Sequence, residues 1–210
     1  MDISSFVDTD LPVSLPIIPN TKSRQIARWV SRAGSPPLLA IAGTLISARA
    51  VALLSAWYWA GFAILTSIGF PLLYILWLLR RGKISDFDIY YRSQRLKPYF
   101  FVMACCGLSL LVMQISLAPH LLRIMTAASL TQTLLMSVIN LRWKISAHAA
   151  AMAGFAVLCF YLGGMLAGLL LLGIPLMIWS RVILHRHTLG QTIAGSLLGA
   201  GIFTVFLLLL

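Results

Sequence analysis

The chain has 210 residues, of which 60% are hydrophobic and 10% charged, so it is long enough for one or two domains but too apolar for an ordinary soluble one, where about a quarter of the residues are charged. Its 16 Lys and Arg residues outweigh five Asp, no Glu occurs, and all five acids precede residue 89, which excludes most carboxylate-based metal or acid–base chemistry. The net charge is +11, and the basic residues lie at the edges of apolar runs. We therefore expect membrane lipids and a phosphate substrate as partners, and no nucleic acid.

Residues 1–34 are expected to form an N-terminal segment that stays on the cytoplasmic side. Acidic residues and prolines, with no basic stretch leading into an apolar one, argue against a cleaved signal peptide. Residues 22–32 place Ile26, Trp29 and Val30 on one side of a helix and basic side chains elsewhere. This pattern predicts a short helix that lies among lipid headgroups, and a flexible basic tail is the alternative.

The rest of the chain, residues 35–210, is predicted to be a single transmembrane domain. A helix needs about 20 apolar residues to cross the hydrocarbon core. The apolar runs fall at about 36–55, 57–79, 99–118, 120–140, 149–165, 167–180 and 189–210. Only a cluster of glycines divides the fifth run from the sixth, so we expect about six or seven spans. The predicted fold class is all-α, a polytopic membrane helical bundle.

Three short polar connectors, 80–98, 141–148 and 180–188, separate these runs. Two spans lie between each consecutive pair, so all three connectors must emerge on one face of the membrane, where they can converge. That face also carries most of the basic residues, namely Lys22, Arg24, Arg28, Arg32, Arg80, Arg81, Lys83, Arg92, Arg95, Lys97, Arg142, Lys144, Arg181 and Arg186. Only Arg49 and Arg123 fall on the opposite face, so the positive-inside rule makes the connector face cytoplasmic, in an inner or plasma membrane.

The connectors and the start of the last span hold side chains that suit phosphate chemistry. In chain order these are Asp86, Asp88, Arg92, Arg95, Lys144, Ser146, His148, Ser180, Arg181, His187 and Gln191. Arg and Lys beside hydroxyl groups form a cradle for phosphate, because a guanidinium binds its oxygens in pairs. One imidazole can attack phosphorus while another protonates the leaving oxygen, a division of roles that needs no metal or other cofactor. Ionisable groups at a membrane boundary are costly unless they are used, so a functional site is predicted here.

The second and third connectors resemble two signature motifs of a known superfamily. Ser146-Ala147-His148, and Ser180-Arg181 with His187 six residues further on, are similar to the second and third motifs of the type-2 phosphatidic acid phosphatases. These are integral membrane lipid phosphate phosphatases whose helical core is shared with vanadium haloperoxidases. The order of the motifs and their separation, which leaves room for two spans, are also similar. The resemblance covers about 88–195.

The resemblance implies a role for each matching residue. His187 would be the nucleophile that forms a phospho-histidine, and His148 would be the general acid. Arg181 and Ser146 would bind the phosphate. Lys144, Arg92, Arg95 and Ser180 complete the set of phosphate-binding candidates that the connectors offer.

The sequence also departs from the family pattern. Gln191 stands where the family usually has an Asp four residues after the nucleophilic His, and its carbonyl can fix the ring tautomer but cannot stabilise an imidazolium as a carboxylate would. Asp86 or Asp88 is a candidate orienting acid in its place. The first motif lacks its usual Lys, and we infer that Lys144 or Arg92 takes over that role. The pattern indicates a divergent subgroup.

Two functions therefore follow from the sequence. The first is a metal-independent membrane phosphatase that acts on a lipid phosphate or a polyprenyl (di)phosphate, with the tail among the spans. The alternative is a protein that binds such a lipid without hydrolysing it, as a carrier or as an enzyme of another reaction on a prenyl diphosphate. Gln191 is the feature that keeps this alternative open.

Overall fold

The computed structural model describes residues 21–210, which contain helices, turns and connecting loops but no strand. The expectations for Asp2, Asp8, Asp10 and the rest of 1–20 lie outside the described residues. The elements in chain order are α1 (Lys22–Ala33), α2 (Pro36–Val51), α3 (Leu54–Ala63), η2 (Ile64–Gly69), α4 (Phe70–Arg80), η3 (Arg92–Arg95), α5 (Leu96–Ile115), α6 (His120–Asn140), α7 (Ala147–Ala167), η4 (Gly168–Leu172), α8 (Gly173–Ile183) and α9 (Leu189–Leu207). The all-α prediction is confirmed for these residues.

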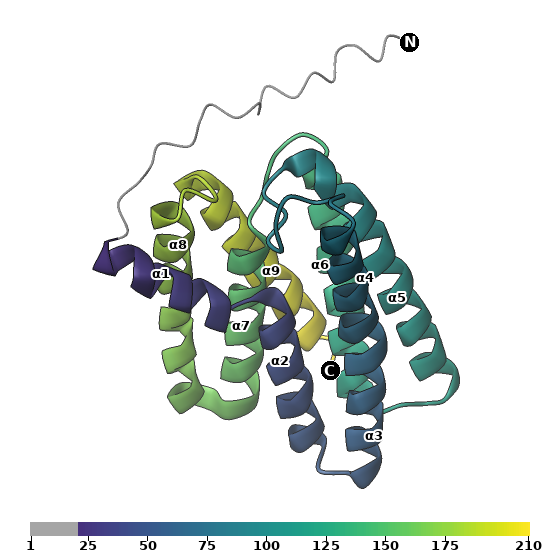
Figure 1. Cartoon of the computed structure of the whole chain (residues 1–210). Helices are drawn as coiled ribbons and strands as arrows, with labels where there is room; N and C mark the ends of the chain where they lie inside the picture. The colour runs from purple at the N-terminus through teal and green to yellow at the C-terminus, as the bar shows by residue number, and fades with distance from the viewer. Residues whose placement is uncertain (1–20) are drawn as a thin grey trace.

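Five helical stretches are long and apolar enough to cross a membrane: Leu54–Arg80, Arg92–Ile115, His120–Asn140, Ala147–Ile183 and Leu189–Leu207. The fourth has 37 residues, but the chain reverses within it at Gly164, whose φ of 63° suits glycine. It therefore forms two antiparallel limbs, α7 and α8 (Figure 1). The shorter apolar helix α2 adds a further segment, with 16 residues.

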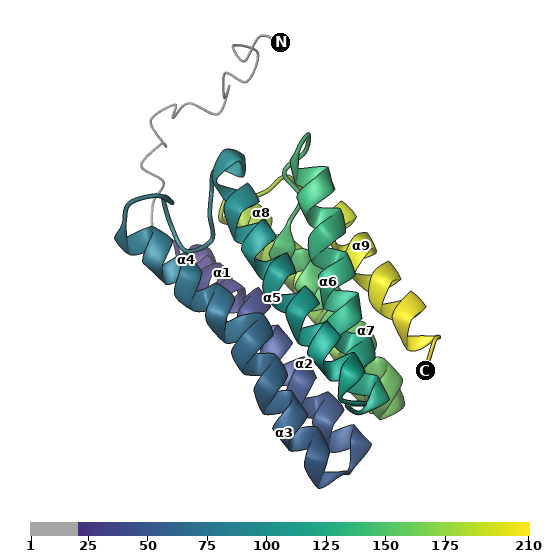
Figure 2. The ribbon, with the colours of Figure 1, turned by 90° about the vertical axis from the view of Figure 1, so that its right-hand side faces the viewer.

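The long helices run side by side (Figure 2). Large apolar side chains lie on the outside of the bundle. Leu108, Leu111 and Ile115 on α5 and Leu197 on α9 are among the exposed ones. No more than a third of any candidate span is buried inside the bundle. Exposed apolar faces of this extent are those of a protein whose solvent is lipid, so the fold fits an integral membrane protein.

The tightest pairing in the bundle joins α7 to α9, and glycines make it possible. A Cβ at Gly195 would lie 2.6 Å from the Ser146 carbonyl oxygen, and one at Gly199 would overlap the Ala150 backbone. Small residues four apart on one helix face let two backbones approach closely in a membrane. This contact brings the start of α7, with His148, next to the start of α9, with Gln191.

Helix α1 runs obliquely across the bundle and packs on α8 (Figure 1). Ala27 and Ser31 are buried in this contact, whereas Ile26 and Trp29 are exposed. The helix predicted within residues 1–34 is thus present, with a bare apolar edge, and its position among headgroups stays a prediction.

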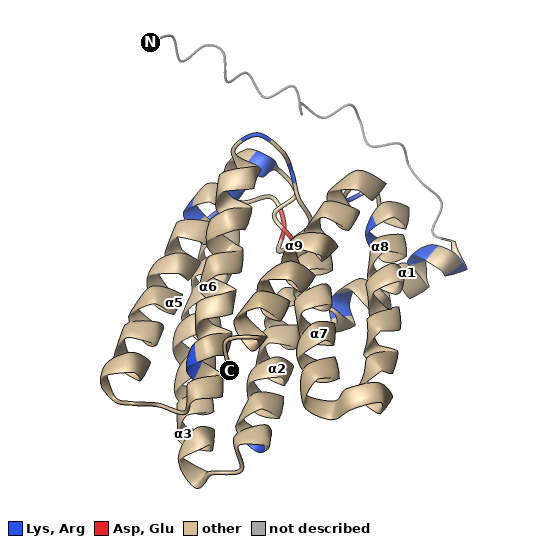
Figure 3. Cartoon of the chain, turned by 180° about the vertical axis from the view of Figure 1, so that it is seen from behind, with Lys and Arg blue, Asp and Glu red and all other residues tan. Residues whose placement is uncertain are grey.

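Most Lys and Arg residues of the described chain lie toward one end of the bundle (Figure 3). That end holds the three loops between α4 and η3, between α6 and α7, and between α8 and α9. Arg49 is in the last turn of α2 and Arg123 is in the first turn of α6, at the helix ends away from these loops. The predicted convergence of the three connectors is therefore seen in the structure, and the cytoplasmic orientation of this end stays a prediction.

Candidate functional site

Ion pairs join the first connector to the third at this end of the bundle. Arg181 Nη1 donates to Asp88 Oδ2 at 2.9 Å, and Arg186 Nη1 donates to Asp86 Oδ2 at 3.0 Å. His148 Nε2, from the second connector, lies 3.8 Å from Asp88 Oδ1. Asp88 is thus the meeting point of all three connectors.

Backbone contacts hold the same loops together. Arg95 Nε donates to the Ile89 carbonyl at 2.8 Å, and Arg95 Nη1 donates to the Ile145 carbonyl at 3.2 Å. The Ser146 amide donates to the Gln191 carbonyl at 3.3 Å. Ile89 has a φ of 49°, in the left-handed region that β-branched residues avoid. A strained residue beside Asp88, fixed by Arg95, is the kind of backbone that persists at functional sites.

The ring of His187 is in contact with the side chain of Gln191. His187 Nδ1 lies 3.2 Å from Gln191 Oε1, and the same oxygen accepts a hydrogen bond from the Thr188 amide at 3.2 Å. Because the amide N–H of Thr188 needs an acceptor, the oxygen of Gln191 must face the ring, and Nδ1 must carry the proton. The lone pair of His187 is therefore on Nε2, which is the nucleophilic nitrogen.

His187 is held neutral. It is 8% exposed and lines a cavity. Burial is the main reason that the pKa of His187 falls from 6.5 to about 2, and the positive charges of Arg95, Arg181 and Lys144 lower it further, against the hydrogen bond to Gln191. A neutral imidazole surrounded by cations is suited to attack an anionic phosphate that those cations bind.

Asp88 lies beside the other histidine and stays ionised. Burial alone would raise the pKa of Asp88, but the charges of His148, Arg181 and Arg186 and the hydrogen bond from Arg181 lower it below 3.8. Burial and the charge of Arg181 favour a neutral His148 ring, and the Asp88 carboxylate opposes them by favouring the protonated ring that a general acid needs. Asp88 is thus placed to assist His148 rather than His187.

Arg181 is the most deeply buried cation of the site, with 2% of its side chain exposed. Besides Asp88, it donates to Ser31 Oγ of α1 at 2.6 Å. Its Nε is buried and has no hydrogen-bond partner among residues 21–210. Unpaired guanidinium donors in a buried site are costly and suit an anionic ligand.

Four of the predicted site residues have other partners. Ser146 caps α7 by accepting from the Ala149 amide, and Ser180 donates to the Ala27 carbonyl of α1. Arg92 donates to the Leu141 carbonyl, which ties the first connector to the second. Lys144 lies 3.9 Å from the centre of the Tyr90 ring. Of these residues, Ser180 faces α1 and is not placed to contact a phosphate in the cavity.

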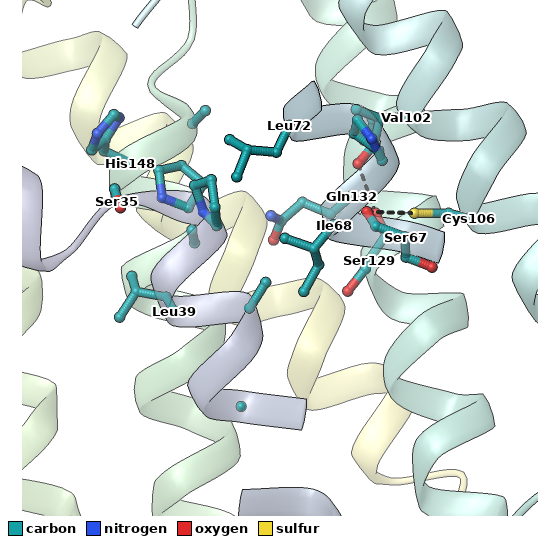
Figure 4. Close-up of a pocket in the computed structure, with 18 of the residues that line it drawn as sticks. Ser35, Leu39, Ser67, Ile68, Leu72, Val102, Cys106, Ser129, Gln132 and His148 are labelled. Atoms are coloured by element: carbon teal, nitrogen blue, oxygen red, sulfur yellow. Dashed lines mark hydrogen bonds between the residues drawn. The ribbon is translucent and has the colours of Figure 1, made fainter. Parts of the chain in front are cut away.

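The cavity itself has a volume of about 320 Å³. Asp88, Arg95, His148, Arg181 and His187 line its mouth, and it continues inward between α2, α4, α5, α6 and α7. Most of the inner wall is apolar, as in Leu39, Ile68, Leu72 and Val102 (Figure 4). A small headgroup at the mouth with an apolar tail below it would fit this shape.

Sequence reasoning missed two parts of the site. Tyr90 lies under both Lys144 and Arg186, at 3.9 and 5.5 Å from its ring centre, and Ser31 supports Arg181 from α1. Neither belongs to a motif. The Tyr90-Tyr91 pair next to the acidic turn was the one available signal, because aromatic faces attract cations.

Within residues 21–210, no group of three or more His, Cys, Asp or Glu side chains could hold a metal ion. No protein-family model, curated protein or solved structure matches the chain.

Proposed function

We propose that the chain is an integral membrane phosphatase that hydrolyses a lipid phosphate or polyprenyl (di)phosphate through a phospho-histidine, as a divergent relative of the type-2 phosphatidic acid phosphatases. The observation that carries this proposal is the pair of buried histidines at one cavity mouth, beside Arg95 and Arg181. One ring presents a lone pair and the other lies against a carboxylate. The site would face the cytoplasm.

The reaction follows from these positions. Arg181 and Arg95, with Lys144 at the rim, bind the phosphate oxygens. Nε2 of His187 attacks phosphorus while the bond from phosphorus to the lipid oxygen breaks, and His148 donates its proton to that oxygen. Water then attacks the phospho-histidine, His148 takes a proton from that water, and inorganic phosphate leaves.

In the free protein, the Asp88 carboxylate pairs with Arg181, where the substrate phosphate would bind. When a phosphate binds, it competes with the Asp88 carboxylate for this guanidinium. Asp88 then remains beside His148 and favours its charged form. Gln191 stands where the family usually has an Asp, so in this proposal Asp88 is the one carboxylate that assists the reaction, and it acts on His148.

The first test is phosphate release by the purified full-length protein in detergent, with EDTA present, from phosphatidate, farnesyl diphosphate and undecaprenyl diphosphate. We expect turnover of at least one substrate. His187→Asn should lower the rate at least about a thousandfold because it removes the nucleophile. His185→Asn is the matched control, since His185 is exposed and has a positive φ of 53°, which Asn tolerates.

The covalent step has its own readout. Acid-labile, alkali-stable label from a labelled substrate should appear on the wild type and be absent from His187→Asn. His148→Ala should recover activity on p-nitrophenyl phosphate, whose leaving group needs no proton. Full activity in His187→Asn contradicts the proposal, and an inactive wild type that still binds these lipids supports the carrier alternative.

A further inference from the structure

One edge of α1 is exposed and combines apolar with basic side chains. Trp29 is 70% exposed and Ile26 is 55% exposed. The guanidinium of Arg32 lies 5.9 Å from the centre of the Trp29 ring, and Lys22 is exposed at the start of the helix. These residues are three or four positions apart, so they lie along one side of α1. We call Lys22, Ile26, Trp29 and Arg32 the outer edge of α1.

The bilayer is the surface that the outer edge meets. Only Gly34 and Ser35 separate α1 from the apolar helix α2, so α1 lies where the chain enters the membrane. Trp side chains favour the boundary between lipid and water, and Lys and Arg side chains near this boundary attract anionic headgroups. A bilayer that contains anionic lipids therefore complements both the apolar and the charged parts of the outer edge.

The opposite face of α1 reaches the candidate functional site. Ala27 and Ser31 are four residues apart on this face, and both are buried in the contact with α8. Ser180 donates to the Ala27 carbonyl at 2.7 Å, and Arg181, the next residue, donates from Nη1 to the Ser31 hydroxyl at 2.6 Å. The helix that carries the outer edge therefore also holds the most deeply buried cation of the site.

These contacts decide which donors of Arg181 are available to a ligand. Within residues 21–210, both side-chain hydrogen bonds of Arg181 come from Nη1, one to Ser31 and one to Asp88. Nε has no hydrogen-bond partner in this part of the chain. The N–H of Nε is parallel to one N–H of Nη2, and this pair of donors matches two oxygens of a phosphate. Ser31 holds Nη1 and so leaves the pair for an anion.

Of the two partners of Nη1, Ser31 is the one that a bound phosphate does not displace. Asp88 and a phosphate are both anions, so they compete for the same guanidinium. A serine hydroxyl is neutral, so it orients Nη1 without cancelling the charge that attracts the phosphate. When a phosphate displaces Asp88, the hydrogen bond to Ser31 still holds the guanidinium in place.

We propose that α1 couples lipid charge to phosphate binding, because anionic headgroups on the outer edge keep Ser31 in contact with Arg181. This proposal rests on the proposed function for the identity of the anion at Arg181. A helix of 12 residues is marginally stable in isolation, so lipid on one face and α8 on the other stabilise the same helical form. Two ligands that favour one conformation strengthen each other's binding. Ser31 is then a positioning residue, and negative lipid charge raises the affinity of the site for phosphate.

The test measures the binding of inorganic phosphate by isothermal titration calorimetry. The full-length protein is placed in nanodiscs of phosphatidylcholine, with or without phosphatidylglycerol, which is anionic but carries no phosphate monoester to hydrolyse. We expect about fivefold tighter binding in the anionic bilayer, at the lower end of typical coupling between two sites. The sign is informative, because a negative surface potential by itself repels phosphate and weakens its binding.

A double variant of the outer edge locates the effect. Trp29→Ala with Arg32→Gln removes one aromatic ring and one charge, and it should abolish the tightening. Trp77→Ala with Arg81→Gln is the matched control, because Arg81 also lies over an exposed ring, 5.8 Å from the centre of Trp77 at the end of α4. The control should keep the full effect of lipid charge.

Ser31→Ala separates lipid binding from the coupling. It should weaken phosphate binding about fivefold in the anionic bilayer and remove the effect of lipid charge, whereas Ser23→Ala, at an exposed position of α1, should change neither. A fluorophore on Gln25→Cys, also exposed, reports the depth of α1 in the bilayer. Ser31→Ala should leave this depth unchanged, which a merely structural role of Ser31 would not.

Each outcome bears on one proposal or on both. Equal or weaker phosphate binding by the wild type in the anionic bilayer overturns the coupling, and lipid hydrolysis in the same sample would leave the phosphatase in place. Tightening that persists in the outer-edge variant or in Ser31→Ala also overturns it, as does the absence of phosphate binding in both bilayers. Coupled phosphate binding without any hydrolysis would keep the role of α1 and reject the phosphatase.

Discussion

At the scale of single residues, the site depends on which atom of Gln191 faces His187. Gln191 Oε1 is in contact with both the backbone N–H of Thr188 and Nδ1 of His187. These two contacts fix the orientation of the Gln191 side-chain amide and of the His187 ring. The hydrogen bond from the Thr188 backbone N–H to Gln191 Oε1 is one half of the capping box of α9. In the other half, the Thr188 hydroxyl accepts from the backbone N–H of Gln191. One side chain therefore caps the start of α9 and orients the ring of His187.

Gln191→Glu tests this arrangement. Glu has the length of Gln, so it keeps the cap, and its carboxylate would stabilise the positive charge that develops on His187 during attack. We expect kcat to rise about tenfold, with a smaller gain for the shorter Gln191→Asp. Steady-state phosphate release measures the effect, with Gln114→Glu as the control. A lower rate in both variants would show that the pocket requires a neutral group at this position.

The depressed pKa of His187 predicts a stability that falls with acid. Its pKa is 6.5 in the unfolded chain and about 2 in the folded one, so below pH 6.5 the unfolded state binds a proton that the folded state does not. Stability from this residue is complete above pH 6.5 and is lost at up to about 1.4 kcal/mol per pH unit as the pH falls toward 2. Asp88 adds a similar loss only below 3.8, because its folded pKa is also lowered.

The measurement is thermal unfolding in detergent between pH 7 and pH 4.5, a range above the titration of Asp88. His187→Asn should show a weaker acid dependence than the wild type, whereas His185→Asn should follow the wild type. Identical pH profiles for wild type and His187→Asn would mean that the ring is already protonated in the folded protein, which would contradict a neutral nucleophile.

At the scale of elements, the close contact of α7 and α9 determines where His148 and Gln191 meet. The contact is between backbones, since Gly195 and Gly199 face Ser146 and Ala150. Backbones cannot adjust as flexible side chains do, so a methyl group at this interface must push the helices apart. The two histidines would separate with them.

Gly199→Ala should therefore destabilise the protein by about 1–3 kcal/mol and lower activity further than stability alone explains. Gly201→Ala is the matched control on the same helix, because a Cβ at Gly201 meets no atom within 4 Å. It should be neutral or slightly stabilising, since Ala favours helices over Gly. Thermal unfolding and phosphate release at a temperature well below unfolding measure the two effects. Equal behaviour of the two variants would argue against this interface as the positioning device.

At the scale of the whole molecule, the distribution of charge sets the expected topology. The basic end carries the three loops and the site (Figure 3). Arg49 and Arg123 are in the helix turns farthest from these loops. The bias of basic residues predicts that the site faces the cytoplasm. A phosphate substrate would then be recognised from the cytoplasmic leaflet.

Cysteine labelling checks this orientation. Ser85→Cys lies in the first connector and Ser116→Cys in the turn after α5, and both serines are exposed. An impermeant maleimide applied to intact cells should label Ser116→Cys alone, and Ser85→Cys should react only after permeabilisation. The reverse pattern would place the site outside. The three native cysteines lie within helices and should stay unlabelled in the wild type.

The sequence alone determined the helical membrane fold and the face on which the connectors lie, because both follow from the length and spacing of the apolar runs. Apolar runs of fixed minimum length give a helical membrane bundle because hydrocarbon leaves backbone groups no partner outside a helix or barrel. The spacing of the connectors by pairs of spans then places Asp88, His148 and His187 on one face. The capping pattern of Thr188 and Gln191 is local, so it too could be expected from the chain.

Tertiary structure decided what depends on distance between segments far apart in sequence. Only packing shows that Asp88 bridges His148 and Arg181, that Ser180 faces α1, and that Gly164 turns one apolar stretch into two limbs. Side-chain contacts between helices leave no pattern within either helix, so the sequence alone could not show them.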